Sequence, residues 1–86
     1  METGTIVLSM AGRDQGRLLL VLEAPEENFR LVADGKLRSL GEPKRKKIKH
    51  LKRVGYSQEL SRLYQAGALT DRLLKQKLQL FEEKAE

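Results

Sequence analysis

The sequence predicts a mainly β protein, in which a small barrel or sandwich of short strands is followed by a C-terminal helical hairpin. Apolar and β-branched stretches separated by turn residues occupy positions 5–40, a spacing typical of small all-β folds. From position 57 the apolar residues recur every three or four positions, which is typical of amphipathic helices. With 86 residues the chain has the length of one domain. We expect the barrel within 1–54 and the hairpin within 55–86.

The first three expected strands lie at 5–10, 17–23 and 29–33. The second of them, RLLLVLE, is apolar at consecutive positions, so we expect both of its faces to be buried. A turn is expected at 11–16, AGRDQG, where two glycines can adopt positive φ and Asp14 can bond to its own backbone. Another turn is expected at 24–28 because Pro25 suits the first central position of a turn.

The Asp34-Gly35 pair is among the strongest short signals for a two-residue hairpin. A type I′ turn needs positive φ at both central positions, and this pair of residue types tolerates it. We therefore expect a returning strand at 37–40, LRSL. Closure of the strands into a barrel would solve the problem of open sheet edges.

The stretch KRKKIKHLKR, residues 44–53, follows Pro43 and holds seven Lys or Arg residues and the only histidine. We call it the basic segment and expect it to add a fifth strand on the rim of the sheet. A helix is the alternative, because Ile48, Leu51 and Gly55 are spaced at three and four positions.

Two short helices are expected after the basic segment. Ser57 is suited to cap the first helix, Glu59 to its first turn and Gly67 to its end. Thr70 and Asp71 begin the second helix in the same way. The expected apolar faces comprise Leu60, Leu63 and Tyr64 in the first helix and Leu73, Leu74, Leu78 and Phe81 in the second. Neither helix is long enough to be stable alone, so these faces must dock on each other, on the barrel or on a partner.

The net charge of +5 is concentrated in the basic segment. Residues 1–43 hold five Lys/Arg and seven Asp/Glu, and residues 54–86 hold five of each, so residues 44–53 supply +7. Like charges this dense repel one another, and an anionic partner relieves the repulsion. Contacts of Lys and Arg with phosphates release condensed counterions, so the segment predicts salt-sensitive nucleic-acid binding.

The residues expected to bind RNA are those of the basic segment with a polar side chain and two arginines of the first turn. They are Arg13, Arg17, Lys44, Arg45, Lys46, Lys47, Lys49, His50, Lys52 and Arg53. Phe29 and Phe81 are expected in the core, and Tyr56 is either a stacking residue or a core residue. So few aromatic residues cannot form the stacking platform of a single-strand binder, which favours recognition of structured RNA through phosphates and shape.

No constellation for catalysis, metal binding or a cofactor is evident. His50 has no cysteine or carboxylate placed near it by sequence, and neither a G-x-S-x-G elbow nor a G-x-x-x-x-G-K-[ST] loop occurs. We therefore expect a protein that is not an enzyme. The N-terminal residues lack the pattern of a signal peptide, and the longest apolar run, LLLVL, is too short to span a membrane. The absence of cysteine suits a reducing cytoplasm.

The stretch GTIVLSMAGRDQGRLLLVLE resembles a KOW motif, with its starting glycine, apolar strand, glycine-bounded turn and second apolar strand. KIKHL, residues 47–51, resembles the N-I-K-H-L ending of the large-subunit ribosomal proteins grouped as the fourteen-e, six-e and twenty-seven-e family. With VADGKLRSL between them, the resemblance spans residues 4–52. It implies an SH3-like five-stranded β-barrel that binds ribosomal or other structured RNA, as in small bacterial KOW-domain RNA-binding proteins of the translation machinery.

Two other functions are weighed against RNA binding. As an adaptor of the transcription or translation machinery, the chain would present the Leu-rich face of its hairpin to RNA polymerase or a ribosomal protein. Attachment to an anionic membrane is disfavoured, because membrane-surface helices carry bulky apolar residues opposite their charges. The basic segment offers only Ile48 and Leu51 for that role.

Overall fold

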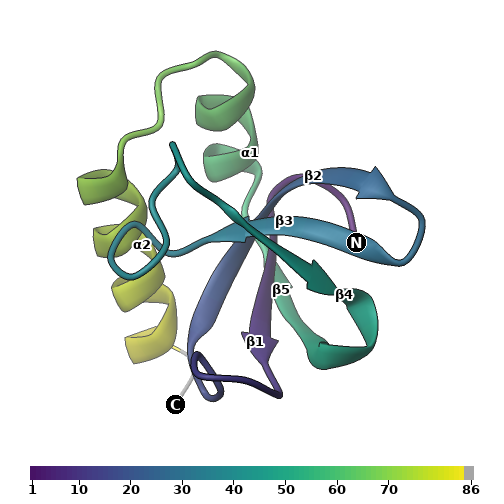
Figure 1. Ribbon diagram of the computed structural model, residues 1–86. Helices are drawn as coiled ribbons and strands as arrows, with labels where there is room; N and C mark the ends of the chain where they lie inside the picture. Colours follow the sequence, from purple (N-terminus) through teal and green to yellow (C-terminus); the bar gives the residue numbers. More distant parts are fainter. Residues whose placement is uncertain (85–86) are drawn as a thin grey trace.

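Five antiparallel strands form one sheet, and two α-helices follow it, so the mainly β prediction is confirmed (Figure 1). The computed structural model describes residues 1–84. Its elements are β1 (Thr5–Ser9), β2 (Leu18–Glu26), β3 (Phe29–Ala33), β4 (Lys44–Lys47), the 3-10 helix η1 (Ile48–His50), β5 (Leu51–Tyr56), α1 (Gln58–Gln65) and α2 (Asp71–Lys84). The expected strands 5–10, 17–23 and 29–33 thus correspond to β1, β2 and β3.

The two edge strands of the sheet are consecutive in the chain. The strand order is β4-β3-β2-β1-β5, so β4 and β5 lie at opposite edges although only η1 separates them. The sheet must therefore curl until both edges reach η1 (Figure 1). Backbone hydrogen bonds hold the junction: Ile48 N donates to Asn28 O at 2.9 Å, and Met10 N donates to His50 O at 2.8 Å.

Residues 19–22 of β2 are buried on both faces, as the continuous apolar run predicted, whereas the last four residues of the strand are exposed. Leu20 and Leu22 belong to a core cluster under the helices, whereas Leu19 and Val21 belong to a second cluster on the other side of the sheet. Because successive side chains of a strand point to opposite faces, one strand serves both clusters. The first cluster contains Ile6, Leu20, Leu22, Ala33, Leu60, Leu74 and Leu78, and the second contains Val7, Leu19, Val21, Val32 and Leu51.

The helical hairpin docks on the sheet. Leu60 of α1 and Leu74 and Leu78 of α2 are buried against β1, β2 and β3 in the first cluster. The two predicted caps are confirmed, because Ser57 Oγ accepts from Leu60 N at 3.1 Å and Thr70 Oγ1 accepts from Leu73 N at 3.2 Å. The helices therefore complete the core of the sheet. The expected boundary after position 54 lies inside β5, which ends at Tyr56.

The predicted hairpin at Asp34-Gly35 and its returning strand at 37–40 are wrong. Residues 34–43 form a loop, and the strand that returns beside β3 is β4. Asp34 Oδ1 accepts from the backbone N–H groups of Lys36 and Arg38, both at 2.9 Å. Such side-chain bonds to the following backbone compete with sheet pairing. Of the pair Asp34 and Gly35, only Gly35 has positive φ, so the type I′ geometry is absent.

The turn predicted at 24–28 is shorter than expected, since β2 continues to Glu26. Pro25 lies in the strand because β1 pairs only with Leu18–Leu20, which leaves this end of β2 paired with β3 alone. A proline is tolerated where its missing N–H faces no partner strand. The basic segment is a strand at 44–47 and again from 51, as expected, but η1 interrupts it between these stretches.

The loop after β3 packs closely against the start of α2. Leu40 N donates to Asp71 Oδ1 at 2.7 Å. Gly35 adopts φ +79°, and a Cβ added there would lie 2.2 Å from Asp71 O. The loop therefore requires glycine both for its conformation and for its distance from the helix.

We expect Gly35→Ala to destabilise the protein more than Gly16→Ala. Gly16 has φ +87°, but a Cβ built there meets nothing within 4 Å among the described residues, so alanine costs about 1–2 kcal/mol for its conformation alone. Gly35→Ala adds the collision with Asp71, for about 1–3 kcal/mol more. Urea unfolding of both variants measures the difference. Equal losses of stability would contradict the close approach of loop and helix.

Candidate nucleic-acid interface

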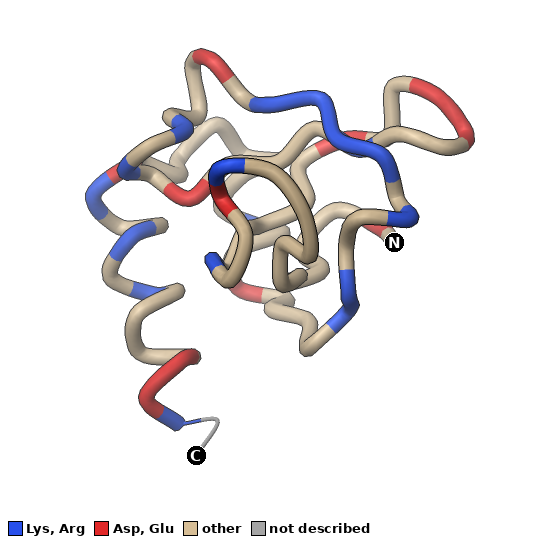
Figure 2. The backbone as a smooth tube through the Cα atoms, turned by 60° about the horizontal axis from the view of Figure 1, so that its bottom comes forward, with Lys and Arg blue, Asp and Glu red and all other residues tan. Residues whose placement is uncertain are grey.

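The basic segment follows one edge strand, crosses η1 and enters the other edge strand, and Figure 2 shows this nearly continuous run of cationic positions. Its side chains do not share one environment. We call the exposed cationic residues the basic strip: Arg45, Lys47, Lys49, Lys52 and Arg53. Lys44 and His50 are half-buried, and Lys46 is buried.

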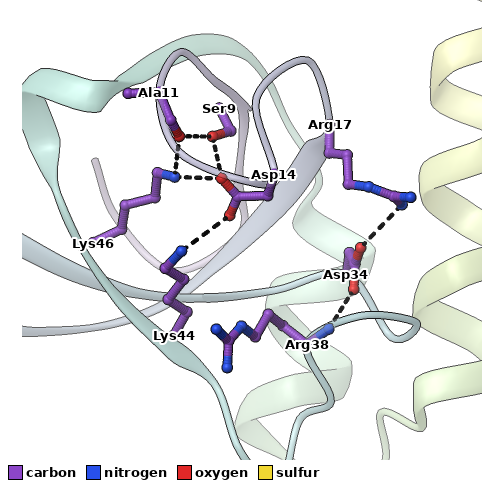
Figure 3. Close-up of polar contacts among 8 residues, drawn as sticks. All are labelled: Ser9, Ala11, Asp14, Arg17, Asp34, Arg38, Lys44 and Lys46. Atoms are coloured by element: carbon purple, nitrogen blue, oxygen red, sulfur yellow. Dashed lines mark hydrogen bonds and ion pairs between the residues drawn. The ribbon is translucent and has the colours of Figure 1, made fainter.

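Lys46 does not belong to the exposed surface on which the sequence prediction placed it. The side chains of β4 alternate, so Lys46 points to the face opposite that of Arg45 and Lys47. Its side chain is only 5% exposed. The ammonium group donates to Asp14 Oδ1 at 2.5 Å and to Ala11 O at 2.7 Å (Figure 3). Lys46 is therefore a structural residue that ties β4 to the 11–16 turn.

Asp14 does more than shape its own turn. Its buried carboxylate accepts from Ser9 Oγ at 2.7 Å as well as from Lys46, and Lys44 Nζ lies 3.8 Å from its second oxygen (Figure 3). Burial acts to raise the pKa of Asp14, but the hydrogen bonds from Lys46 and Ser9 and the charges of both lysines outweigh burial. The pKa of Asp14 consequently lies below its ordinary value.

The two arginines of the first turn have different surroundings. Arg13 is exposed on the 11–16 turn, and the Ala11 carbonyl of the same turn accepts from Lys46 of β4. Arg17 points toward Asp34, away from Lys46 (Figure 3), and its Nη1 lies 3.7 Å from Asp34 Oδ2. Arg17 therefore contributes to the loop after β3 rather than to the surface of β4.

Arg45 lies over the ring of Phe29, with its guanidinium carbon 3.5 Å from the ring centroid. The pairing of β3 with β4 places Phe29 opposite Lys47 and Leu31 opposite Arg45, so Arg45 reaches Phe29 diagonally on one face of the sheet. Arg45 also forms an ion pair with Glu26. Phe29 was predicted in the core but is only half-buried, because it lies on this face near the end of the sheet.

Carboxylates neutralise only the first part of the basic segment. Ion pairs join Lys44 and Lys46 to Asp14 and Arg45 to Glu26. Within residues 1–84, no ion pair involves the four later cationic residues, Lys47, Lys49, Lys52 and Arg53. The positive charge available to an external partner is therefore centred on η1 and the start of β5.

Two of the open hollows on the surface formed by residues 1–84 differ in their charge. One, with a volume of about 670 Å³, lies between the first turn, the loop after β3 and α2. Its lining mixes three cationic and three acidic residues, namely Arg17, Lys36, Lys75, Asp34, Glu82 and Glu83. The other, of about 590 Å³, lies beside the basic strip and is lined by Asn28, Phe29, Lys47, Ile48 and Lys49. Only the second has an excess of positive charge.

His50 contributes its backbone to the junction of η1 with the end of β1, where its carbonyl accepts from Met10. Across residues 1–84 there is no group of three or more histidine or acidic residues able to hold a metal ion. None of the helices described is both long and apolar enough to cross a membrane. The chain matches no protein-family model, and it matches no curated protein sequence.

We expect Lys46→Met to destabilise the fold and Lys47→Met to leave its stability nearly unchanged. Loss of Lys46 leaves the buried carboxylate of Asp14 without its closest cation, which should lower the free energy of unfolding by about 3 kcal/mol. Lys44 limits this loss because its ammonium group also lies near Asp14. Lys47 is exposed, so its replacement should cost less than about 0.5 kcal/mol. Chemical unfolding of the two variants measures both values. Similar losses would contradict the structural role of Lys46.

The lowered pKa of Asp14 predicts a loss of stability in acid. The unfolded chain has an Asp pKa of about 3.9, so the stabilisation from ionised Asp14 is complete above that pH. It is lost as the pH falls through the lower folded-state value. Asp14→Asn should therefore destabilise the protein at neutral pH, and the difference from the parent should shrink in acid. Urea unfolding across a pH series measures this, and a difference independent of pH would contradict it.

Proposed function

We propose that this protein is a non-catalytic RNA-binding module that contacts the phosphates of structured RNA through its basic strip. One observation carries the proposal: within residues 1–84, four exposed cationic side chains, those of Lys47, Lys49, Lys52 and Arg53, take part in no ion pair. Fixed positive charge that no carboxylate neutralises attracts a polyanion and gains affinity by counterion release. The curled sheet holds these side chains at defined positions, which suits recognition of a folded RNA by shape.

The KOW-like sequence and the topology together support the finer form of the proposal. In that form the sheet is an SH3-like barrel, since its edge strands are consecutive and meet at η1. The resemblance to large-subunit ribosomal proteins favours ribosomal RNA as the partner and a cytoplasmic ribonucleoprotein as the setting. The RNA-contacting residues proposed are the basic strip with Arg13, and Lys44 contributes at its margin.

The adaptor alternative has less support than RNA binding. It relied on an apolar helical face offered to a partner, but Leu60, Leu74 and Leu78 are already buried against the sheet. RNA polymerase or ribosomal proteins would then have to contact the remaining helix surface, which is mainly polar although Leu80 is exposed on it. The basic strip is therefore better suited to bind a polyanion than the helical hairpin is to bind a protein.

Affinity for a folded RNA should fall steeply with salt. If about five phosphates are contacted, the logarithm of the association constant should fall with the logarithm of salt concentration at a slope near −4, using about 0.7–0.9 per phosphate. The double variant Lys49→Gln, Lys52→Gln should weaken binding and reduce the slope by about 2. Fluorescence anisotropy of a labelled ribosomal RNA hairpin at several salt concentrations measures both.

The matched control is Lys75→Gln with Lys84→Gln, which removes the same charge from exposed positions of α2. These changes should leave the slope unchanged. Equal effects of the two pairs would mean that net charge alone drives binding, which contradicts a specific strip. Crosslinking in cells followed by sequencing of the bound RNA then identifies the partner, and recovery only at background level would contradict an RNA-binding role.

A further inference from the structure

The hollow beside the basic strip has a composition that phosphate binding alone does not require. It lies where the β2–β3 turn meets η1, and the hydrogen bond from Ile48 N to Asn28 O at 2.9 Å joins its two sides. Phe29 and Ile48 supply an aromatic ring and an aliphatic side chain. Lys47 and Lys49 add two exposed cations, and no acidic residue of the described chain lines it.

The aromatic ring at this site is held in place. Arg45 covers one face of Phe29, with 3.5 Å between its guanidinium carbon and the ring centroid, and Glu26 in turn pairs with Arg45. A fixed ring loses little conformational freedom when a second flat group packs against it. The volume of about 590 Å³ lies within the range of small-molecule sites, roughly 300–1,000 Å³.

We infer that this hollow receives one unpaired nucleotide of the bound RNA, an inference that rests on the proposed RNA-binding function. The base packs against Phe29 and Ile48. The exposed side-chain amide of Asn28, which has both a donor and an acceptor, bonds to the edge of the base. Lys47 and Lys49 contact the phosphates on either side of it.

A nucleotide matches the lining better than other anions do. It combines a flat, largely apolar ring, a hydrogen-bonding edge and adjacent negative charge, and the hollow offers a partner for each. An acidic peptide would use the lysines but supplies no flat group for Phe29. The larger hollow under α2 lacks this combination, since its charges are mixed and no aromatic residue lines it.

The test uses the full-length protein and two RNA hairpins with the same backbone. One carries a single bulged nucleotide, and in the other that nucleotide is abasic, so the number of phosphates is equal. The hairpin with the base should bind about tenfold more tightly, as expected for stacking of one base on an aromatic side chain. Phe29→Leu should abolish this preference without changing the salt slope, because leucine keeps an apolar side chain and no charge is altered.

Tyr56→Leu is the matched control, since it removes an exposed aromatic ring at the far end of β5 from η1. It should keep the preference for the hairpin with the base. The second test variant, Asn28→Ala, should leave the packing of the core unchanged, because Asn28 is exposed and has no positive φ. It should reduce the preference about twofold, as for one weak hydrogen bond. Thermal unfolding establishes that each variant is folded.

The outcomes separate this inference from the proposed function. Equal affinity of the parent for both hairpins, with a steep salt slope, overturns the nucleotide site and leaves phosphate binding intact. Failure to bind either hairpin overturns both. A preference that survives in Phe29→Leu and in Asn28→Ala also overturns the site. An oligoglutamate peptide tests the alternative of a peptide site. If it binds the parent as tightly as the hairpin does, and Phe29→Leu abolishes that binding, the hollow is a peptide site instead.

Discussion

The buried ion pair between Lys46 and Asp14 is the constraint on which the basic surface depends. It fastens β4 to the 11–16 turn and so fixes which face of β4 points inward. Once Lys46 is inside, strand alternation sends Arg45 and Lys47 outward. A buried pair of this kind is costly to break and adds little net stability over an apolar pair. Its value here is in orientation, because it sets the face of β4 on which Arg45 and Lys47 lie.

This pair also explains how so dense a basic segment is compatible with a small fold. Asp14 and Glu26 come from distant parts of the sequence and form ion pairs with the first three cations of the segment. Repulsion within β4 is thereby relieved, and β4 can pair with β3. The later cations lie at the end of β4, on η1 and on β5, where they are exposed and solvent screens them. The first three residues of the basic segment thus help to hold the fold together, and its later cations form no ion pair within residues 1–84.

Local signals in the sequence were enough to predict much of the fold. Strands β1 to β3, the caps at Ser57 and Thr70 and the double burial of β2 depend on neighbouring residues, and the structure confirms them. The loop after β3 was mispredicted because Asp34 bonds to the backbone that follows it and because Leu40 bonds to Asp71, which lies 31 positions away. The role of Lys46 could not be foreseen either, since it depends on the pairing of β4 with β3. The charge of the basic segment predicted a cationic surface but not that Lys46 would be buried. Phe29 was assigned to the core because its contact with Arg45 cannot be read from the sequence.

The positions of β4 and β5 at the two margins of the sheet have a separate consequence for self-association. An unpaired strand margin presents a row of free backbone groups on which another molecule of the same chain can add its own strand. Lysine side chains along such a margin oppose this, because two copies would bring like charges together. The residues proposed to hold RNA therefore also keep separate molecules from joining into extended β assemblies.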